Sequence, residues 1–167
     1  MAKEPKTKKG SIPAPEVSGP PVQAQVMMQY IKDLSFENPN ISRLMEGPGE
    51  NPNLKLEVNV NAQRMATDVY ESAIDFKAHT VSKQGTIYIF EVVYAGLFKI
   101  QNIPEKALEP FLLINCPSLL FPYLRRLVSD ITREGGFPPL LLDPIDFAGL
   151  YIRRQQEQAA SSQEVKN

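Results

Sequence analysis

The sequence predicts an α+β fold, in which the strands of an antiparallel sheet come first and the helices that cover the sheet follow. Two observations predict this order. Apolar and polar residues alternate with a period of two through the first part of the folded region, and from Pro104 onward the apolar residues recur at helical spacing. A third observation sets the size: 167 residues, 43% of them hydrophobic, can bury the core of one ordinary domain.

The two ends of the chain are too polar to contribute to that core. Residues 1–24 contain four lysines and five prolines and few large apolar groups, so they cannot bury enough surface to offset chain entropy. The last residues are rich in Gln, Ser and Ala. We therefore expect a disordered extension over 1–24, a folded domain over 25–156 and a flexible tail over 157–167.

The first strand is predicted within Val26 to Phe36, and a long loop follows it. The loop runs from Asn38 to Asn53 and includes three prolines and two glycines. A loop of this length inside a compact domain is usually functional, or it crosses over a surface.

Strict alternation predicts the second and third strands. Leu54, Leu56, Val58 and Val60 alternate with polar residues, which is typical of a strand with one wet face. In the third strand the apolar face consists of Tyr70, Ile74, Phe76 and Ala78, and the polar face of Glu71, Asp75, Lys77 and His79. Lys83 to Gly85 provides the hairpin turn.

The fourth strand is apolar on both faces. Tyr88, Phe90, Val92 and Tyr94 share one face, whereas Ile87, Ile89 and Val93 share the other. A strand of this kind must be covered on both sides. The helices can cover one side, so the other side predicts contacts between subunits, a bound apolar ligand, or both.

Helical features fill the rest of the chain. Pro104 suits a first helical position, and Pro117 is expected to interrupt the first helical segment. An apolar stripe then follows, formed by Leu120, Tyr123, Leu124, Leu127, Val128 and Ile131. Gly135 and Gly136 end this helix, and Asp143 and Pro144 are expected to begin a last helix whose apolar face is Phe147, Leu150 and Tyr151.

Composition argues against several classes of protein. The formal net charge of −1 gives no electrostatic reason to expect nucleic acid or an anionic membrane as partner. No apolar run approaches the length that spans a bilayer, and the N-terminus lacks the hydrophobic stretch of a secretory signal. The lone Cys116 suits a reducing compartment, and with the lone His79 it leaves no pair at metal-ligand spacing. We expect a cytoplasmic protein with no metal and no cofactor.

Four stretches in order along the chain resemble one family, the SecB protein-export chaperones. They are Tyr-Ile-Lys-Asp-Leu-Ser-Phe-Glu-Asn-Pro-Asn at 30–40, Asp-Val-Tyr-Glu at 68–71, Asn-Cys-Pro-Ser-Leu-Leu-Phe-Pro-Tyr at 115–123 and Gly-Phe-Pro-Pro-Leu-Leu-Leu-Asp-Pro-Ile-Asp-Phe at 136–147. Each stretch alone could arise by chance, but the series covers most of the expected folded domain and is highly specific.

The resemblance implies a fold, an assembly and a function. It implies a four-stranded antiparallel sheet with a long crossover loop after the first strand and C-terminal helices packed on the sheet. Two subunits would form a dimer, and two dimers a homotetramer. The implied function is ATP-independent: unfolded preproteins are held in a translocation-competent state and delivered to the SecA translocase motor. Because Gly47-Pro48-Gly49 lacks the lysine of a nucleotide-binding loop, release must follow partner binding.

Three groups of site residues follow from the resemblance. The client groove is expected at Ile41, Leu44, Met45, Leu54, Leu56, Val58, Phe147, Leu150 and Tyr151. The SecA-docking surface is expected at Asp33, Glu37, Ile89 and Glu91, and the oligomer interface at Phe90, Val92, Tyr94, Leu120, Tyr123, Leu124 and Leu127. Many family members carry a large aromatic residue in the crossover loop, but this chain has no Trp, so Leu44 and Met45 would have to supply that contact.

The groove and docking groups also have a plainer interpretation, and three other functions stay open. The groove residues could belong to the subunit core, and Glu91 could be a carboxylate paired with a nearby lysine. The alternatives are a SecB-like chaperone for another client such as a toxin, a carrier of a hydrophobic small ligand, and a small hydrolase using Asp75 or Glu71. No clustering of base, nucleophile and orienting group in the sequence supports the hydrolase.

Overall fold

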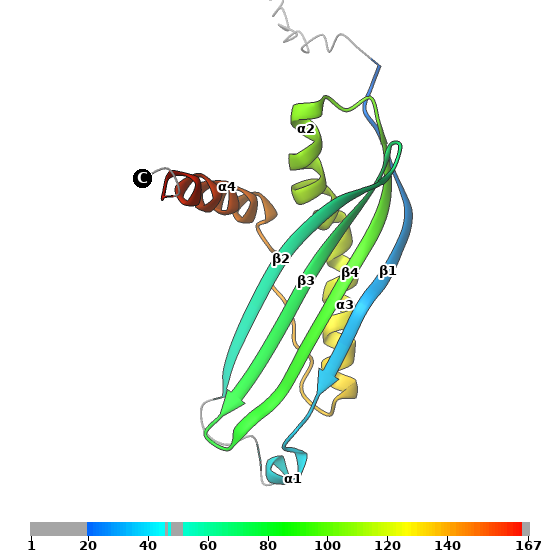
Figure 1. The fold of residues 1–167 in the computed structure, drawn as a ribbon. Coiled ribbons are helices and arrows are strands. Elements are labelled where there is room, and N and C mark those ends of the chain that lie inside the picture. Colours follow the sequence, from blue (N-terminus) through cyan, green and yellow to red (C-terminus); the bar gives the residue numbers. More distant parts are fainter. Residues whose placement is uncertain (1–19, 46, 48–51, 165–167) are drawn as a thin grey trace, which may run out of the picture.

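The computed structural model describes residues 20–45, 47 and 52–164, which form a four-stranded antiparallel sheet with helices on one face (Figure 1). The strands are β1 (Gln23–Glu37), β2 (Asn53–Ala66), β3 (Val69–Ser82) and β4 (Gly85–Gln101), in the spatial order β1-β4-β3-β2. Because β1 and β2 lie at opposite edges, the segment between them crosses from one edge to the other. The predicted α+β fold and its crossover loop are confirmed.

The boundaries of the folded domain differ from those expected. β1 begins at Gln23, inside the segment 1–24, because Gln23 and Ala24 pair with Gln101 and Ile100 of β4. The last helix, α4 (Phe147–Glu164), runs through most of the expected tail, whose Gln, Glu and Ala residues are good helix formers. Residues 1–19 of the extension and 165–167 of the tail lie outside the described residues.

The helices that cover the sheet form one continuous helical segment. Apart from the short α1 (Ile41–Leu44), the chain has α2 (Glu105–Pro110), the π-helix η1 (Phe111–Asn115) and α3 (Cys116–Glu134), which join without a break over Glu105–Glu134. The predicted interruption at Pro117 is therefore wrong. The N–H of Cys116 donates to the carbonyl of Phe111, five residues back, and this wider turn accommodates a proline that cannot donate.

The π-helix leaves one carbonyl to be satisfied from the sheet. In the five-residue pattern the donor to the Leu112 carbonyl would be residue 117, but Pro117 has no N–H. The Ser72 hydroxyl of β3 donates to that carbonyl instead, at 2.8 Å, and Ser72 is fully buried. This bond ties the π-helix to the centre of the sheet.

Replacing Ser72 with alanine is expected to destabilise the subunit by about 1–2 kcal/mol, because the Leu112 carbonyl would stay buried without a donor. Chemical denaturation monitored by circular dichroism measures this change in the free energy of unfolding. Ser118→Ala is the matched control: the Ser118 hydroxyl also bonds a helix carbonyl, that of Ile114, but on an exposed surface. An equal loss of stability in both variants would contradict the structural role of Ser72.

The core lies between α3 and the two central strands. The predicted stripe on α3 buries Leu120, Leu124 and Val128 completely, and the sheet contributes Phe76, Phe90 and Phe98. At Gly96 an added Cβ would lie 2.8 Å from a Leu120 methyl carbon, so glycine permits this close packing. Contrary to expectation, one helix among the described residues, Glu105–Glu134, is long and apolar enough by composition to cross a membrane, but its buried residues pack on the sheet.

The end of α3 agrees with the prediction, whereas the start of the last helix does not. As predicted, α3 ends at Glu134 before Gly135 and Gly136, and Gly136 has a positive φ of 87°. The last helix begins at Phe147 and not at Asp143, which corrects the predicted start. Asp146 is its cap, because its carboxylate accepts the N–H of Gly149 at 2.9 Å. In Figure 1, α4 projects away from the sheet and from α2.

Candidate functional site

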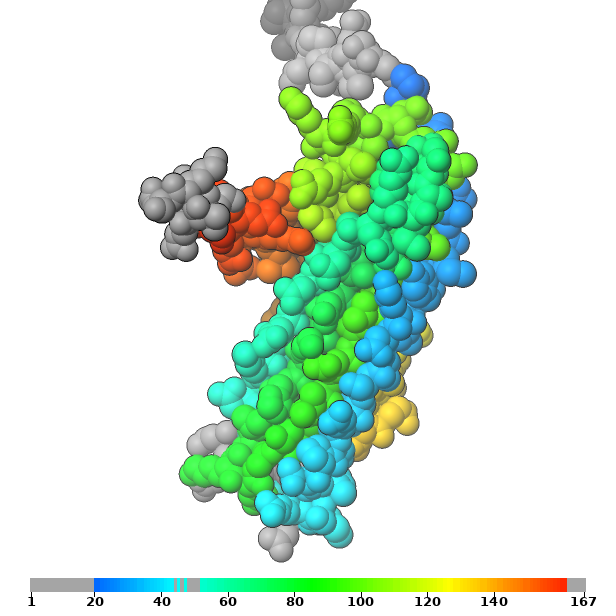
Figure 2. Space-filling model, in the orientation of Figure 1, coloured from blue at the N-terminus to red at the C-terminus, as the bar shows by residue number. Residues whose placement is uncertain are grey.

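The strand register assigns each side chain to one of two faces. Phe90, Val92 and Phe98 of β4 belong to the helix face, defined as the face of the sheet that α3 covers. Ile89, Glu91 and Val93 alternate with them and therefore belong to the opposite face, here called the outer face. Figure 2 views the sheet from the outer face, where all four strands are uncovered.

The four residues expected to dock SecA lie together on the outer face. Asp33 and Glu37 of β1 pair with Val93 and Ile89 of β4, and Glu91 pairs with Ser35 on one side and Lys77 on the other. Residues that are directly opposite in a ladder share a face, so the register puts all three carboxylates on one face. Glu37 is opposite Ile89, Glu91 is two residues from Ile89 on β4, and Asp33 is opposite Val93. Asp33 and Glu37 are exposed, and Ile89 and Glu91 are half-buried.

Basic residues border this acidic group. The Lys77 ammonium lies 3.2 Å from the Glu91 carboxylate, and both side chains are more than 40% exposed. This is the local lysine of the plainer interpretation, and its hydrogen bond with Glu91 holds the pKa of Lys77 above its usual value. A pair this exposed contributes little to stability, so Glu91 stays available to a partner. Lys55 and His79 line the same shallow hollow of about 360 Å³.

Beside the acidic group, a carboxylate is buried on the outer face. Glu71 of β3 is 5% exposed, and it accepts hydrogen bonds from the hydroxyl of Tyr30, from Lys32 Nζ at 2.7 Å and from Gln63 Nε2 at 2.8 Å. The sequence contained this residue within the Asp-Val-Tyr-Glu motif, but its partners come from β1 and β2 and could not be inferred from β3. Burial opposes the charge on Glu71, and the three hydrogen bonds outweigh burial and hold its pKa below the usual value.

The lowered pKa of Glu71 predicts a loss of stability in acid. The unfolded chain takes up a proton at this carboxyl at a higher pH than the folded chain, so the stabilisation is present above the unfolded pKa and is lost as pH falls through the folded pKa. Urea unfolding measured between pH 7 and pH 3 should show wild type more stable than Glu71→Gln at neutral pH, with the difference shrinking in acid. A difference that does not depend on pH would contradict this assignment. Tyr30, whose pKa burial and Glu71 raise to about 12, stays neutral throughout.

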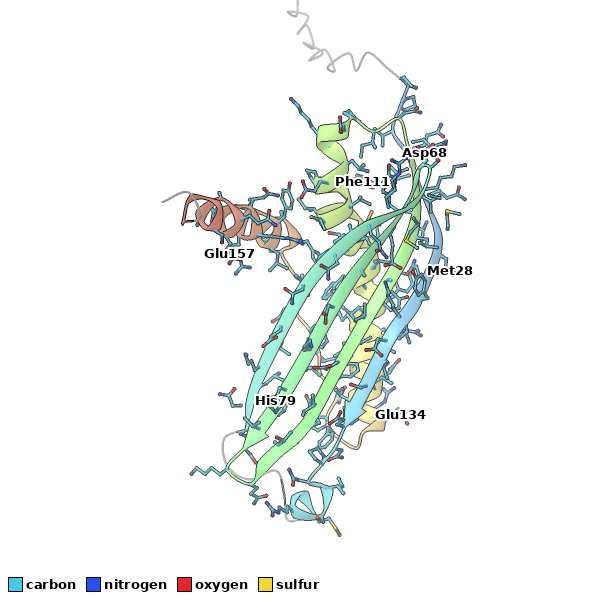
Figure 3. The ribbon with its side chains drawn as sticks, in the orientation of Figure 1. Met28, Asp68, His79, Phe111, Glu134 and Glu157 are labelled. Carbon is cyan, nitrogen blue, oxygen red and sulfur yellow. The ribbon has the colours of Figure 1, made fainter. Side chains whose placement is uncertain are left out.

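A cavity with both apolar and polar lining residues lies at the β2 edge of the sheet. Val58 and Val60 of β2, Leu113 of η1, and Leu150 and Tyr151 of α4 line a space of about 520 Å³. Its polar lining consists of Asn59, Asn61, Asp75, Arg153, Arg154 and Glu157. Glu157 marks this side of α4 in Figure 3.

Two features adjoin this cavity. Arg154 Nη1 donates to the Val60 carbonyl at 2.9 Å and so bridges α4 to the edge of the sheet. Along β2, Leu54 and Leu56 continue the face of Val58 and are 40% and 44% exposed. We call the cavity together with Leu54 and Leu56 the edge groove.

The predicted client residues divide into three sets. Val58, Leu150 and Tyr151 meet in the cavity, and Leu54 and Leu56 lie on the same strand face. Ile41 and Met45 are 56% and 85% exposed, but they lie in and just after α1, at the end of the sheet distant from α4 (Figure 1).

Leu44 and Phe147 complete the predicted client residues. The side chain of Leu44 lies outside the described residues. Phe147 is only 3% exposed and makes an edge-on ring contact with Phe121, so its placement in the groove is wrong. As the first residue of α4, it anchors that helix to the core.

Four of the predicted interface residues are also wrong. Phe90, Val92, Leu120 and Leu124 are at most 1% exposed within one subunit, because α3 packs on the helix face of its own sheet. Tyr94 and Leu127 are half-buried, and Tyr123 is 49% exposed. The exposed apolar residues near them that sequence reasoning missed are Val26, Ile31 and Leu34 of β1 and Leu119 of α3.

Comparison with known proteins agrees with the geometry. The family model described as preprotein translocase subunit SecB matches residues 18–158. A protein-export protein SecB from Afipia carboxidovorans is 41% identical over 151 residues, which cover 90% of this chain and 93% of the relative. A protein of the same name from Bradyrhizobium sp. is 44% identical over 144 residues, covering 86% and 89% of the two chains.

A solved structure shares the fold at lower identity. The SecB-like chaperone of Mycobacterium tuberculosis, solved in complex with a peptide of the HigA1 antitoxin, superposes with a TM-score of 0.59. It is 17% identical, and the match covers 73% of this chain and 90% of that one. On the extent of the family match and the identity to its relatives, the chain belongs to the SecB family of protein-export chaperones.

Proposed function

We propose that the protein holds unfolded secretory precursors in the edge groove and delivers them to the SecA motor. The observation that carries the proposal is the row of Leu54, Leu56 and Val58 on an edge strand, leading into the cavity beside α4. An extended apolar segment can bury its side chains there without matching any particular sequence. Affinity then accumulates at about 25 cal/mol per Å² of apolar surface, less the cost of ordering the client.

The outer face supports the second half of the proposal. Asp33, Glu37 and Glu91 share that face with Ile89, an arrangement suited to a basic segment with one apolar contact. The apolar side chains of the edge groove belong to the helix face of β2, and the acidic group lies on the outer face, around β1 and β4. A precursor and the motor can therefore engage the subunit together, and release follows from partner binding and not from nucleotide hydrolysis. In this proposal the protein is not an enzyme, and it acts in the cytoplasm without a cofactor.

The exposed apolar residues of β1 and α3 support assembly into a homotetramer, as a dimer of dimers. Tyr123 and Leu119 are one helical turn apart and both about half exposed, whereas Leu120 and Leu124 of the same helix are buried. The helix face of β1 carries the exposed residues Val26, Ile31 and Leu34. Strand β1 lies at one edge of the sheet, and its free edge pairs with no other described strand. Apolar surface of this kind is typical of subunit interfaces.

Tyr123→Asp is expected to break the tetramer into smaller species, because each interface copy would bury an unpaired carboxylate. Size-exclusion chromatography with light scattering measures the mass. The control is Gln84→Asp, which adds the same charge at the exposed turn between β3 and β4. A Tyr123→Asp protein that remains tetrameric would place the interface elsewhere.

Binding to one precursor in two states tests the holding function. A fluorescently labelled secretory precursor is titrated with the protein either unfolded, on dilution from urea, or already folded, and anisotropy is recorded. We expect binding of the unfolded precursor and none of the folded form. Equal binding of the two states, or one small molecule per subunit in native mass spectrometry, would favour the hydrophobic-ligand carrier.

A further inference from the structure

Strand β1 contains an extra residue beside the docking carboxylates. Ile31 pairs with Tyr94 and Asp33 pairs with Val93, so Lys32 has no opposite residue in the ladder and forms a β-bulge. The sequence carries a trace of it, because Ile31, Leu34 and Phe36 are spaced three and then two residues apart. A regular strand would keep a spacing of two.

The bulge reverses which residues of β1 face outward. Tyr30, before the bulge, lies opposite Ala95 on the outer face. Without the extra residue, Asp33 and Glu37 would point toward α3, because a shift of one residue exchanges the two faces of a strand. With the bulge, Phe36 points inward and packs its ring against Tyr88 and Phe90, with centroids 5.6 and 6.0 Å away. Asp33 and Glu37 then point outward.

Glu71 holds this bulge from two strands away. Both Tyr30, two residues before the bulge position, and Lys32 itself bond the Glu71 carboxylate, so both must point to the outer face. They reach β3 across β4, where Ala95 is fully buried. From the other side, Gln63 of β2 bonds the same carboxylate oxygen as Lys32.

We propose that Glu71 is the positioning residue of the docking face: it fixes the Lys32 bulge and thereby places Asp33 and Glu37 beside Ile89 and Glu91. Glu71 is 6% exposed in its side chain, so it acts through β1 and not by contact with the motor. This inference rests on the proposed docking function for its consequence, but the link between Glu71 and the bulge is a property of the subunit alone.

The test uses Glu71→Gln in the full chain and two readouts. Hydrogen exchange of the free protein should show amides of residues 33–37 exchanging at least about tenfold faster, with little change in β2. SecA affinity should fall about tenfold, and binding of unfolded precursor should stay within about twofold of wild type. Glu134→Gln is the control, because it makes the same Glu-to-Gln change at the exposed end of α3, and Glu134 has no hydrogen bond to β1 among the described residues.

A milder variant covers the case in which Glu71→Gln does not fold. Tyr30→Phe removes one of the three hydrogen bonds and keeps the ring, and it should give the same two changes at smaller size. Unchanged exchange of residues 33–37 in the folded variant would overturn the positioning role, even if SecA affinity fell. If wild type did not bind SecA, the docking function would be refuted, and the exchange result would still decide whether Glu71 holds the bulge.

Discussion

Glu91→Lys should weaken binding of the SecA motor by about 30-fold or more and leave the holding of unfolded precursors unchanged. The substitution reverses a charge between Asp33 and Glu37 and places a second ammonium beside Lys77, which lies 3.2 Å from the native carboxylate. Two like charges at that distance repel a basic partner as well as each other. Isothermal titration calorimetry with purified SecA measures the loss.

The control for this variant is Glu134→Lys, which makes the same change in charge at the end of α3, on the other side of the sheet. Figure 3 labels Glu134 at the lower end of α3, the helix that lies behind the sheet in this view. Its SecA affinity should stay within about threefold of wild type. An equal loss of SecA affinity in the two variants would show that the net charge of the protein, and not the position of Glu91, determines SecA binding. A parallel loss of precursor binding in Glu91→Lys would show that docking and holding do not use separate faces.

Replacing Leu54 and Leu56 together with asparagine should weaken the holding of precursors by roughly 30-fold and leave SecA binding intact. Both leucines are already partly exposed, so each loses only the apolar area that a client would cover, about 1 kcal/mol per residue. The same exposure means that the fold should tolerate the change. Fluorescence anisotropy with an unfolded precursor measures the affinity.

The matched control replaces two residues on the other face of the same strand. Lys55→Asn with Glu57→Asn introduces the same residue twice, keeps the net charge, and removes only an exposed ion pair of 2.7 Å. Precursor affinity should then change by less than about twofold. If the control and the leucine variant lost affinity equally, the edge groove would not be the holding site.

Sequence patterns predicted the elements of the fold well where one face of an element is polar. The alternation from Leu54 to Val60 located β2, and the stripe from Leu120 to Ile131 located α3. The register of the acidic residues also followed, because Asp33 and Glu37 both come after the bulge and so share a face.

Patterns failed where two elements had to be placed against each other. The strand around Phe90 is apolar on both faces, and the sequence does not say which face α3 covers, so its core residues were assigned to an oligomer interface. Phe147 is expected in the groove by resemblance alone, and no local pattern shows that its ring packs against Phe121 of α3. The π-helix and the Glu71 cluster depend on contacts across the sheet, from Ser72 to Leu112 and from Tyr30 to Glu71, which no local pattern contains.

Light scattering of a denatured secretory precursor, diluted into buffer with and without the purified protein, tests the central claim most directly. The account predicts that scattering falls in proportion to the protein added, without ATP, until the precursor is fully bound, and that the Leu54 and Leu56 double variant requires much more protein. Undiminished aggregation at a molar excess of the wild-type protein would contradict the account.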